Sequence, residues 1–315
     1  MKWIVQLLPL LLLLGCKSTS AIQQATIKGV SLVILGTVQD GGSPHAGCQK
    51  DCCKELFAHP DPNRQVVSLG VVDAVHQKNY LFEATPDLPR QIKHLRQLST
   101  FASKESPDGI FITHAHIGHY SGLMYLGREA MHTKDVPVYV LPRMQQFIRN
   151  NGPWSQLVNL HNIALQPIQD TQTVILTPAL QIRPFTVPHR DEFSETVGFI
   201  ISGPNKKALF IPDIDKWEKW GHSIANAIAQ VDYAFVDATF YDAAEINNRN
   251  MAEIPHPFVV ESMELLKNLP AAEKRKVFFI HFNHTNPLLN ANSPQAKTVL
   301  ANGFNIAKIN QVFYL

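Results

Sequence analysis

The sequence predicts a domain of the mixed α/β class, in which two β-sheets form one unit and helices cover their outer faces. The order of the elements leads to this prediction, because each half of the 315-residue chain begins with strand-like segments and then alternates strands with helices. No stretch rich in proline and glycine separates the halves. Hydrophobic residues make up 45% of the chain and charged residues 17%, which is typical of a globular protein.

The strands of the first half are predicted from short runs that are apolar or that alternate in polarity. They are expected at residues 30–35, 69–75, 80–83, 109–113 and 136–141. A glycine-rich turn, residues 36–42, follows the first of them. Helical spacing of leucine and isoleucine predicts one helix over residues 86–98, and a second helix is expected over residues 120–131.

The second half of the chain repeats this style. Its strands are expected at residues 174–176, 180–187, 196–202, 207–211, 233–236 and 277–280. Its helices are expected at residues 217–230 and 258–266. Alternation of this kind places strands next to one another in a sheet and helices against its faces.

The N-terminal residues have the layout of a secretory leader. Residues 7–14 are almost pure leucine, and this run is too short to span a bilayer. Residues 13–16, which end in Cys16, resemble a bacterial lipoprotein box, and the alternative is an ordinary signal peptide with a chance cysteine. We therefore expect a signal peptide over residues 1–15, a lipidated Cys16 with a linker over residues 16–29, and a folded domain over residues 30–315.

This leader predicts export to the bacterial cell envelope, with the chain held to the membrane by its lipid anchor and facing the periplasm or the exterior. The formal net charge of +2 gives no large basic face, so we expect no nucleic-acid partner. The expected partner is a small-molecule substrate. The sequence leaves the oligomeric state open.

Three cysteines remain once Cys16 is set aside, and they lie within six residues. Cys48, Cys52 and Cys53 could hold a structural zinc ion with His45 as the fourth ligand, since three thiolates and one imidazole complete a tetrahedron. A disulfide that leaves one thiol over, or three free thiols, are the alternatives.

Potential metal ligands follow four predicted strands directly. The segment 113–120 reads THAHIGHY and holds three histidines, and neutral imidazole is the commonest metal ligand. Strand ends on one edge of a sheet converge, so these side chains can share one cleft. The residues are His114, His116 and His119 after the strand 109–113, His189 after 180–187, Asp213 after 207–211, and His281 after 277–280.

This order and spacing resemble the metallo-β-lactamase superfamily, which implies an αββα sandwich and a centre of one or two zinc ions. Carried onto this chain, the family pattern assigns His114, His116 and His189 to one metal ion. It assigns His119 and His281 to a second ion, and Asp213 bridges the two. The resemblance covers roughly residues 30–315.

A closer likeness is to the B proteins of pyrroloquinoline quinone biosynthesis and to the cyclic phosphodiesterases of phosphonate breakdown. It rests on the glycine and cysteine segment 36–53, on the segment 237–241 (DATFY) and on the segment 281–287 (HFNHTNP). His256 also has a counterpart in the quinone proteins. These segments do not fix the substrate.

One position departs from the family motif H-x-H-x-D-H, because Gly118 stands where the family has aspartate. The second metal site then lacks a carboxylate. The protein could work with one ion, another residue such as Asp40 or His284 could complete the second site, or the site could be weak. Asp40 is more simply interpreted as a turn residue.

The resemblance implies a metal-dependent hydrolase that uses a zinc-activated water on an ester, phosphodiester or lactam-like bond, and the leader implies that this hydrolase is exported. Asp213 would orient or deprotonate the water, and His284 or His256 would protonate the leaving group. Asp237 and Asp191 would orient histidine ligands. The alternatives are an oxidative enzyme of quinone-cofactor synthesis, or a degenerate envelope protein that binds metal without catalysis.

Overall fold

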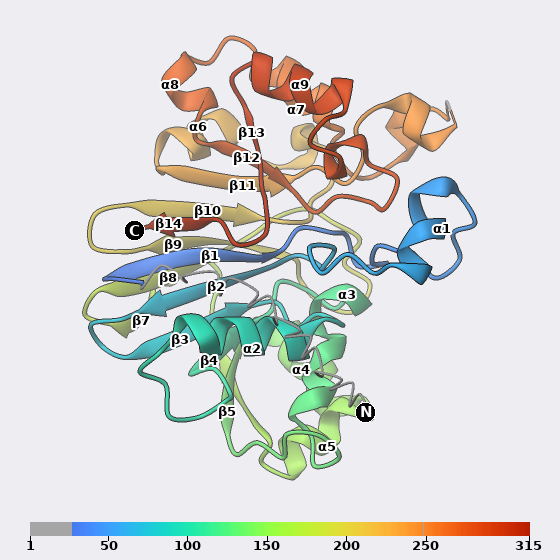
Figure 1. Cartoon of the computed structure of the whole chain (residues 1–315). Coiled ribbons are helices and arrows are strands. Elements are labelled where there is room, and N and C mark those ends of the chain that lie inside the picture. The colour runs from blue at the N-terminus through green and yellow to red at the C-terminus, as the bar shows by residue number, and fades with distance from the viewer. Residues whose placement is uncertain (1–26, 248) are drawn as a thin grey trace, which may run out of the picture.

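Two seven-stranded β-sheets lie face to face in the computed structural model, with helices on both outer faces (Figure 1). The structure describes residues 27–247 and 249–315. This arrangement confirms the predicted αββα sandwich. The expected leader peptide and the lipidated Cys16 lie outside the described residues, so the division of the chain into leader, linker and domain stays a prediction.

The first sheet has the strand order β14-β1-β2-β3-β4-β5-β6. β1 pairs antiparallel with β14 and β2, β2 pairs antiparallel with β3, and the pairs from β3 to β6 are parallel. The strands of this sheet are β1 (Val30–Gly36), β2 (Ser68–Asp73), β3 (Lys78–Phe82), β4 (Gly109–Phe111), β5 (Val136–Val140), β6 (Ile163–Pro167) and β14 (Val312–Tyr314).

The second sheet has the order β13-β12-β11-β10-β9-β8-β7. Its pairs are antiparallel from β7 to β10 and parallel from β10 to β13. The strands of this sheet are β7 (Val174–Thr177), β8 (Leu180–Thr186), β9 (Val197–Ser202), β10 (Lys207–Ile211), β11 (Tyr233–Asp237), β12 (Val277–Ile280) and β13 (Asn305–Ile306).

Three apolar layers hold the sandwich together. The middle layer lies between the sheets and contains stacked and edge-to-face aromatic rings, such as Phe82, Phe111 and Phe199. The two outer layers join each sheet to its helices. The α-helices are α1 (Asp51–Ala58), α2 (Leu88–Leu98), α3 (Ile117–Tyr120), α4 (Pro142–Asn150), α5 (Trp154–Asn159), α6 (Ile224–Ala229), α7 (Val259–Leu265), α8 (Ala271–Lys274) and α9 (Pro294–Ala301).

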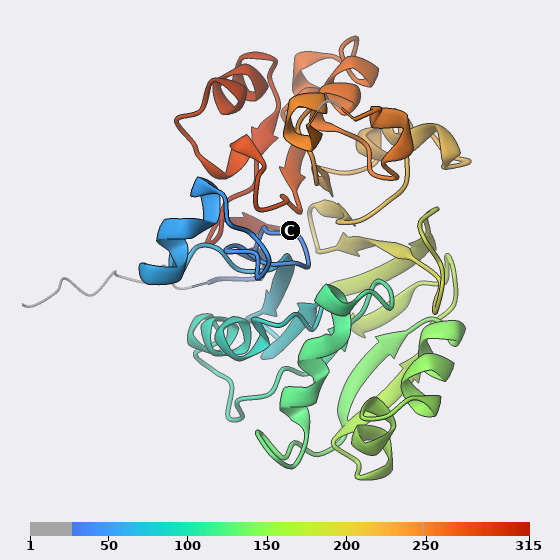
Figure 2. The ribbon, with the colours of Figure 1, turned by 90° about the vertical axis from the view of Figure 1, so that its right-hand side faces the viewer.

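The topology brings several strand ends to one edge of the sandwich. β1, β3 and β4 run in the same direction in the first sheet, because two antiparallel steps join β1 to β3 and a parallel step follows. β8, β10, β11 and β12 share one direction in the second sheet for the same reason. The loops at this edge face the viewer in Figure 2.

Some predicted elements differ from the structure in detail. The helix expected over residues 120–131 is a short α3 followed by a 3₁₀ turn, Ser121–Leu126. The helix expected over residues 217–230 is a 3₁₀ turn, Trp217–Lys219, followed by α6, because Gly221 and the Ser223 N-cap interrupt it. In the part of the chain that the structure describes, no helix is both long and apolar enough to cross a bilayer.

Candidate metal centre

Four side chains from three strand ends form a first group of possible ligands. The ring atom Nδ1 of His116 lies 2.8 Å from Nε2 of His114 and 3.2 Å from Nε2 of His189. The carboxylate atom Oδ2 of Asp213 lies 3.4 Å from Nε2 of His114 and 3.3 Å from Nε2 of His189. The sequence prediction named each of these residues, and the structure brings them together.

A second group shares Asp213 with the first. His119 and His281 direct their Nε2 atoms to the carboxylate of Asp40, at 3.6 Å and 3.3 Å from its Oδ1 atom. His119 Nε2 also lies 3.8 Å from Oδ2 of Asp213. We call the two groups together the histidine centre; its members are Asp40, His114, His116, His119, His189, Asp213 and His281.

The outer nitrogen of each histidine in the centre lies close to a polar side chain. His119 Nδ1 lies 3.0 Å from Glu83, and His114 Nδ1 lies 2.9 Å from the hydroxyl of Thr113. His281 Nδ1 lies 2.9 Å from the hydroxyl of Thr239. His116 Nε2 contacts Glu192 at 3.1 Å, and His189 Nδ1 faces Asp215 at 3.4 Å. Metal-binding histidines have this arrangement, since the outer partner fixes the ring and its tautomer.

Two inner ring nitrogens of the second group lack hydrogen bonds. His119 Nε2 and His281 Nε2 are buried with no hydrogen-bond partner among the described residues. An unpaired buried polar group costs about 1–3 kcal/mol, so such atoms are rare unless a ligand satisfies them. Nitrogen ligands around a tetrahedral zinc ion lie roughly 3.3 Å apart. The measured separations of 2.8–3.4 Å in the first group therefore fit a metal ion.

Opposing charges set the protonation of the centre. Burial alone would raise the pKa of Asp213, but His189 and His256 hold that pKa well below its usual value. Burial opposes ionisation of Asp40 too, yet His119 and His281 keep its pKa well below the usual value. Both carboxylates are therefore ionised at neutral pH.

The histidines of the centre divide according to their neighbours. Burial lowers the pKa of His114 well below its usual value, so its ring is neutral, as a metal ligand must be. Burial would also lower the pKa of His281, but Asp237 and Asp40 raise it to about 9. A metal ion bound by His281 would displace that proton, because histidine binds metal as the neutral ring.

His256 lies between two carboxylates at the side of the centre. Its Nδ1 atom is 3.1 Å from Oδ1 of Asp213 and 2.9 Å from Oδ2 of Asp237. Burial lowers the pKa of His256, but Asp237 and Asp213 outweigh burial and raise it well above the usual value. Asp237 is itself fixed by the backbone N–H groups of Ile214 and Thr239. The structure thus places the predicted His256 and Asp237 next to the centre.

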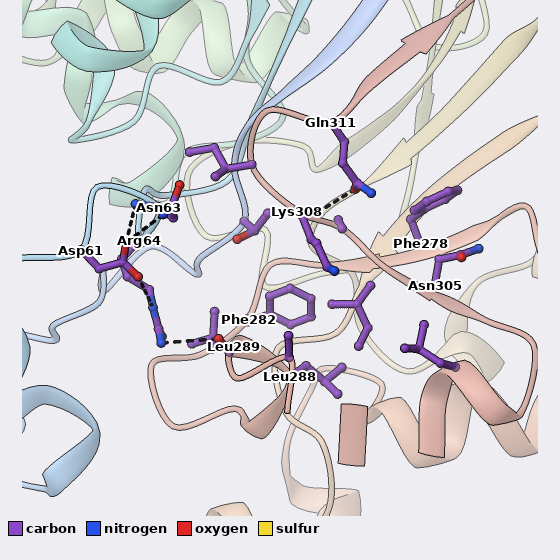
Figure 3. A pocket seen from close by; sticks show the side chains of 16 residues that line it. Asp61, Asn63, Arg64, Phe278, Phe282, Leu288, Leu289, Asn305, Lys308 and Gln311 are labelled. Carbon is purple, nitrogen blue, oxygen red and sulfur yellow. Dashed lines mark hydrogen bonds and ion pairs between the residues drawn. The ribbon is translucent and has the colours of Figure 1, made fainter. Parts of the chain in front are cut away.

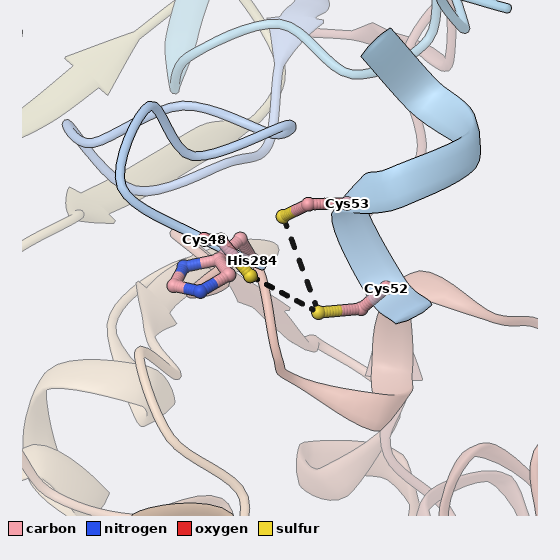
Figure 4. Close-up of side chains that lie close together, drawn as sticks. All are labelled: Cys48, Cys52, Cys53 and His284. Carbon is pink, nitrogen blue, oxygen red and sulfur yellow. Dashed lines mark hydrogen bonds between the residues drawn. The ribbon is translucent and has the colours of Figure 1, made fainter. Parts of the chain in front are cut away.

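A separate group of sulfur atoms lies on the loop after β1 and on α1 (Figure 4). The Sγ atoms of Cys48 and Cys52 are 3.8 Å apart, and those of Cys52 and Cys53 are 4.0 Å apart. All three cysteines are free thiols. His284, from the segment after β12, completes a set of four possible ligand atoms, which we call the cysteine cluster.

The structure differs from the predicted roles of His45 and His284 at the cysteine cluster. His45 was expected as its fourth ligand, but Nδ1 of His45 accepts the N–H of Gly47, and its ring stacks on His284 at 4.6 Å. His284 was expected as a proton donor at the active centre, but it lies with the cysteines instead. The fourth possible ligand atom therefore comes from a residue more than two hundred positions further along the chain.

Two supporting residues were missed by the sequence prediction. Glu83 follows β3 and is fully buried, and its carboxylate also accepts hydrogen bonds from the backbone N–H and hydroxyl of Thr113. Asp215 faces His189, whereas the predicted Asp191 accepts from Thr196 instead. The sequence offered one signal for Glu83, because it is an acidic residue that directly follows an apolar strand. That strand ends at the edge where the other strands carry possible ligands.

A cavity of about 450 Å³ is lined by side chains from the segment before β2 and from the C-terminal part of the chain (Figure 3). Phe278, Phe282 and Leu288 form its apolar wall, and Arg64 and Lys308 supply charge. Arg64 is already paired with Asp61, at 3.5 Å. The residues that line this cavity include no member of the histidine centre, so the cavity is not the expected active site.

Comparison with known proteins places the chain in a family. Residues 78–282 match the model of the β-lactamase superfamily domain. The curated protein "Coenzyme PQQ synthesis protein B" from Methylococcus capsulatus is 27% identical over 308 residues, which cover 87% of this chain and 96% of that protein. The protein of the same name from Xanthomonas axonopodis pv. citri is 24% identical and covers 88% and 97%.

Solved structures confirm the fold. Zn²⁺-bound PqqB from Methylobacterium extorquens has a TM-score of 0.73 and 22% identity, and the match covers 90% of this chain and 100% of that one. A diphosphatase from the PhnP family has a TM-score of 0.61 and 19% identity, with 90% and 96% covered. The fold is the metallo-β-lactamase fold, and a bound zinc ion in the first of these structures supports metal binding by the fold.

The predicted export to the cell envelope is wrong in light of these relatives. The chain matches proteins of coenzyme synthesis over nearly their whole length, and none of these names describes an envelope protein. The prediction depended only on the leucine-rich run and Cys16, which lie outside the described residues.

Proposed function

The chain belongs to the β-lactamase superfamily, and from this membership we propose a metal-dependent hydrolase that cleaves an ester, phosphodiester or lactam-like bond in a small molecule. The superfamily supports a hydrolase-type enzyme in general terms. The observation that carries the proposal is the pair of ligand groups that share Asp213. Ligand atoms at this spacing, each supported from outside, have no simpler use than to hold metal ions.

The two ligand groups divide the metal-binding work. His114, His116 and His189 would hold one zinc ion, His119 and His281 would hold a second, and Asp213 would contact both. When bound, zinc supplies Lewis-acid chemistry, which polarises a carbonyl or phosphoryl oxygen and lowers the pKa of water. The histidine rings are held in place, because Glu83, Thr113 and Thr239 contact their outer nitrogens.

His256 is the residue in the best position to move a proton. Its Nδ1 atom contacts both Asp213 and Asp237, so the ring is held at the side of the centre. The two carboxylates raise its pKa well above the usual value, which favours the protonated ring. His256 would then donate a proton to the leaving group, while Asp213 orients the attacking water.

The cysteine cluster is proposed as a structural zinc site with His284 as the fourth ligand. Thiolates bound to one tetrahedral zinc ion lie roughly 3.8 Å apart. The measured separations of 3.8 and 4.0 Å agree with this value and are far too long for a disulfide bond. Such a site would tie the loop after β1 and α1 to the segment after β12.

A second candidate function is a reaction of quinone-coenzyme synthesis. It is favoured by the two relatives named for PQQ synthesis, which the chain matches at 24–27% identity over most of its length. That reaction would be oxidative, and it would require iron and O₂ rather than zinc and water alone. The hydrolase proposal predicts turnover that is unaffected by removal of O₂.

Metal analysis of the purified protein, alongside activity with phosphodiester, ester and lactam reporters, tests the proposal. We expect bound zinc and hydrolysis of one reporter class. His114→Ala should lose the activity and the zinc of the histidine centre, and it should keep the ion of the cysteine cluster. His161→Ala is a matched control, because the His161 side chain is 77% exposed and, among the described residues, pairs only with Asp135. Substoichiometric metal together with unchanged activity in His114→Ala would refute the hydrolase proposal. Turnover that requires O₂ and iron would favour the second candidate.

A further inference from the structure

The carboxylate that the family motif carries at position 118 has a counterpart elsewhere in this chain. Gly118 lies in α3, buried between His116 and His119, and it leaves the motif without an acidic side chain. Asp40, on the loop after β1, is 78 positions away in the sequence. Its carboxylate nevertheless belongs to the group formed with His119, Asp213 and His281.

Asp40 fills the space that a side chain at position 118 would occupy. A Cβ atom built on Gly118 would lie 2.0 Å from the Cβ of Asp40 and 2.4 Å from its Cα. Side chains cannot approach so closely, and here the obstacle includes backbone rather than only a flexible chain end. The φ angle of Gly118 is not positive, so this glycine is required for space and not for an unusual backbone conformation.

The loop that carries Asp40 is held in register with the strand end that carries His281. The backbone N–H of Gln39 donates to Phe282, and the N–H of Phe282 donates to Thr37, both at 2.8 Å. The side-chain amide of Gln39 donates from Nε2 to Oδ1 of Asp40 at 2.8 Å. The carboxylate is therefore fixed next to His281 and is only 14% exposed.

We propose that Asp40 replaces the motif aspartate as the carboxylate of the second metal group, and that Gly118 provides the space for it. This inference rests on the proposed metal centre. It predicts that positions 40 and 118 are interchangeable as sources of the carboxylate but cannot both carry a side chain. The chain would then bind two ions at the centre despite its altered motif.

Reciprocal variants test the exchange through metal content rather than activity. Asp40→Gly should lose one zinc ion per chain relative to the wild type, and the double variant Asp40→Gly/Gly118→Asp should regain it. Gly118→Asp alone should lower the unfolding temperature, because two side chains compete for one space. Asp40→Gly/Gly118→Ala is the matched control, since it adds a Cβ atom but no carboxylate and should stay one ion short.

The readouts are zinc per folded chain by elemental analysis and calorimetric titration of the chelator-treated protein. The cysteine cluster contributes equally to every variant, so differences report the histidine centre. If the Asp40→Gly variant retains the zinc count and zinc affinity of the wild type, the inference about Asp40 is wrong, but the proposed metal centre is unaffected. A double variant that stays one ion short, or Gly118→Asp with wild-type stability, would overturn the inference as well. If His114→Ala binds as much zinc as the wild-type protein, the proposed function is refuted instead.

Discussion

Each ligand group of the histidine centre brings four possible ligand atoms within 4.8 Å of one another, as the cysteine cluster does, but the chain builds the centre and the cluster differently. The centre collects side chains from the ends of several strands in both sheets, and most of its members are buried. The cysteine cluster takes three ligands from six consecutive residues, and its Cys52 is exposed. The centre is thus positioned by the fold, whereas the cluster positions a loop.

The difference extends to the contacts behind the ligands. The histidines of the centre direct their outer nitrogens to a carboxylate or a hydroxyl, so the rings are held before any ligand arrives. In the cluster, the described contact of this kind is Nδ1 of His284 with Asn283. We therefore expect variants of the centre to affect metal binding and activity first, and variants of the cluster to affect stability first.

The largest expected effect comes from Asp213, because both ligand groups share it. Asp213→Ala should remove zinc from the centre and lower turnover more than 100-fold, since loss of even an outer partner costs about 10–100-fold in affinity or activity. Metal content and turnover on the best reporter measure this, with the melting curve as a check on folding. Asp135→Asn, at an exposed carboxylate whose partner among the described residues is His161, should match the wild type.

A smaller effect, of a different kind, is expected from the cysteine cluster. Cys52→Ser should release one zinc ion and lower the unfolding temperature while turnover remains near the wild-type value. A ligand at about 100 times its dissociation constant stabilises the fold by about 2.7 kcal/mol, or roughly 5 °C for a chain of this size. Loss of turnover on the scale of Asp213→Ala would show instead that the cluster is part of the active centre.

The same comparison explains which parts of the site the sequence could predict. His114, His189, Asp213 and His281 were predictable because each follows an apolar strand, and parallel strand ends meet at one edge. His45 was expected in place of His284 because nearness along the chain was taken for nearness in space. Asp40 was interpreted as a turn residue because nothing in its local sequence shows that position 118 leaves room for it.

The fold was predictable to a similar degree and for similar reasons. Strands with strong apolar patterns lie close to their expected positions, since burial on both faces of a sheet requires such runs. The helices expected over residues 120–131 and 217–230 are interrupted in the structure. The first segment is held by a contact distant in sequence, the hydrogen bond from the N–H of Gly122 to Ala84, whereas Gly221 and the Ser223 N-cap interrupt the second.

Glu83 tests whether the outer contacts of the centre matter as proposed. Its Oε1 atom contacts Nδ1 of His119 at 3.0 Å, and the same carboxylate accepts from Thr113, so it supports both ligand groups. Glu83→Gln keeps the shape but removes the charge, and it should weaken zinc binding about 10–100-fold. Competition with a chelator measures the affinity. Unchanged affinity would mean that the centre is held by its strands alone.

The smallest expected effect separates two neighbouring carboxylates near His189. Asp215 lies 3.4 Å from Nδ1 of His189, whereas Asp191 is exposed and accepts from Thr196. Asp215→Asn should therefore weaken zinc binding by about 10-fold, the lower end of the range for an outer partner, because its contact is long. Asp191→Asn should leave zinc affinity unchanged in the same chelator competition. Equal losses of zinc affinity in both variants would indicate that general negative charge, rather than a specific contact with the ring, supports His189. The contrast between a centre held by specific contacts and a cluster held by its own ligands would then be weaker.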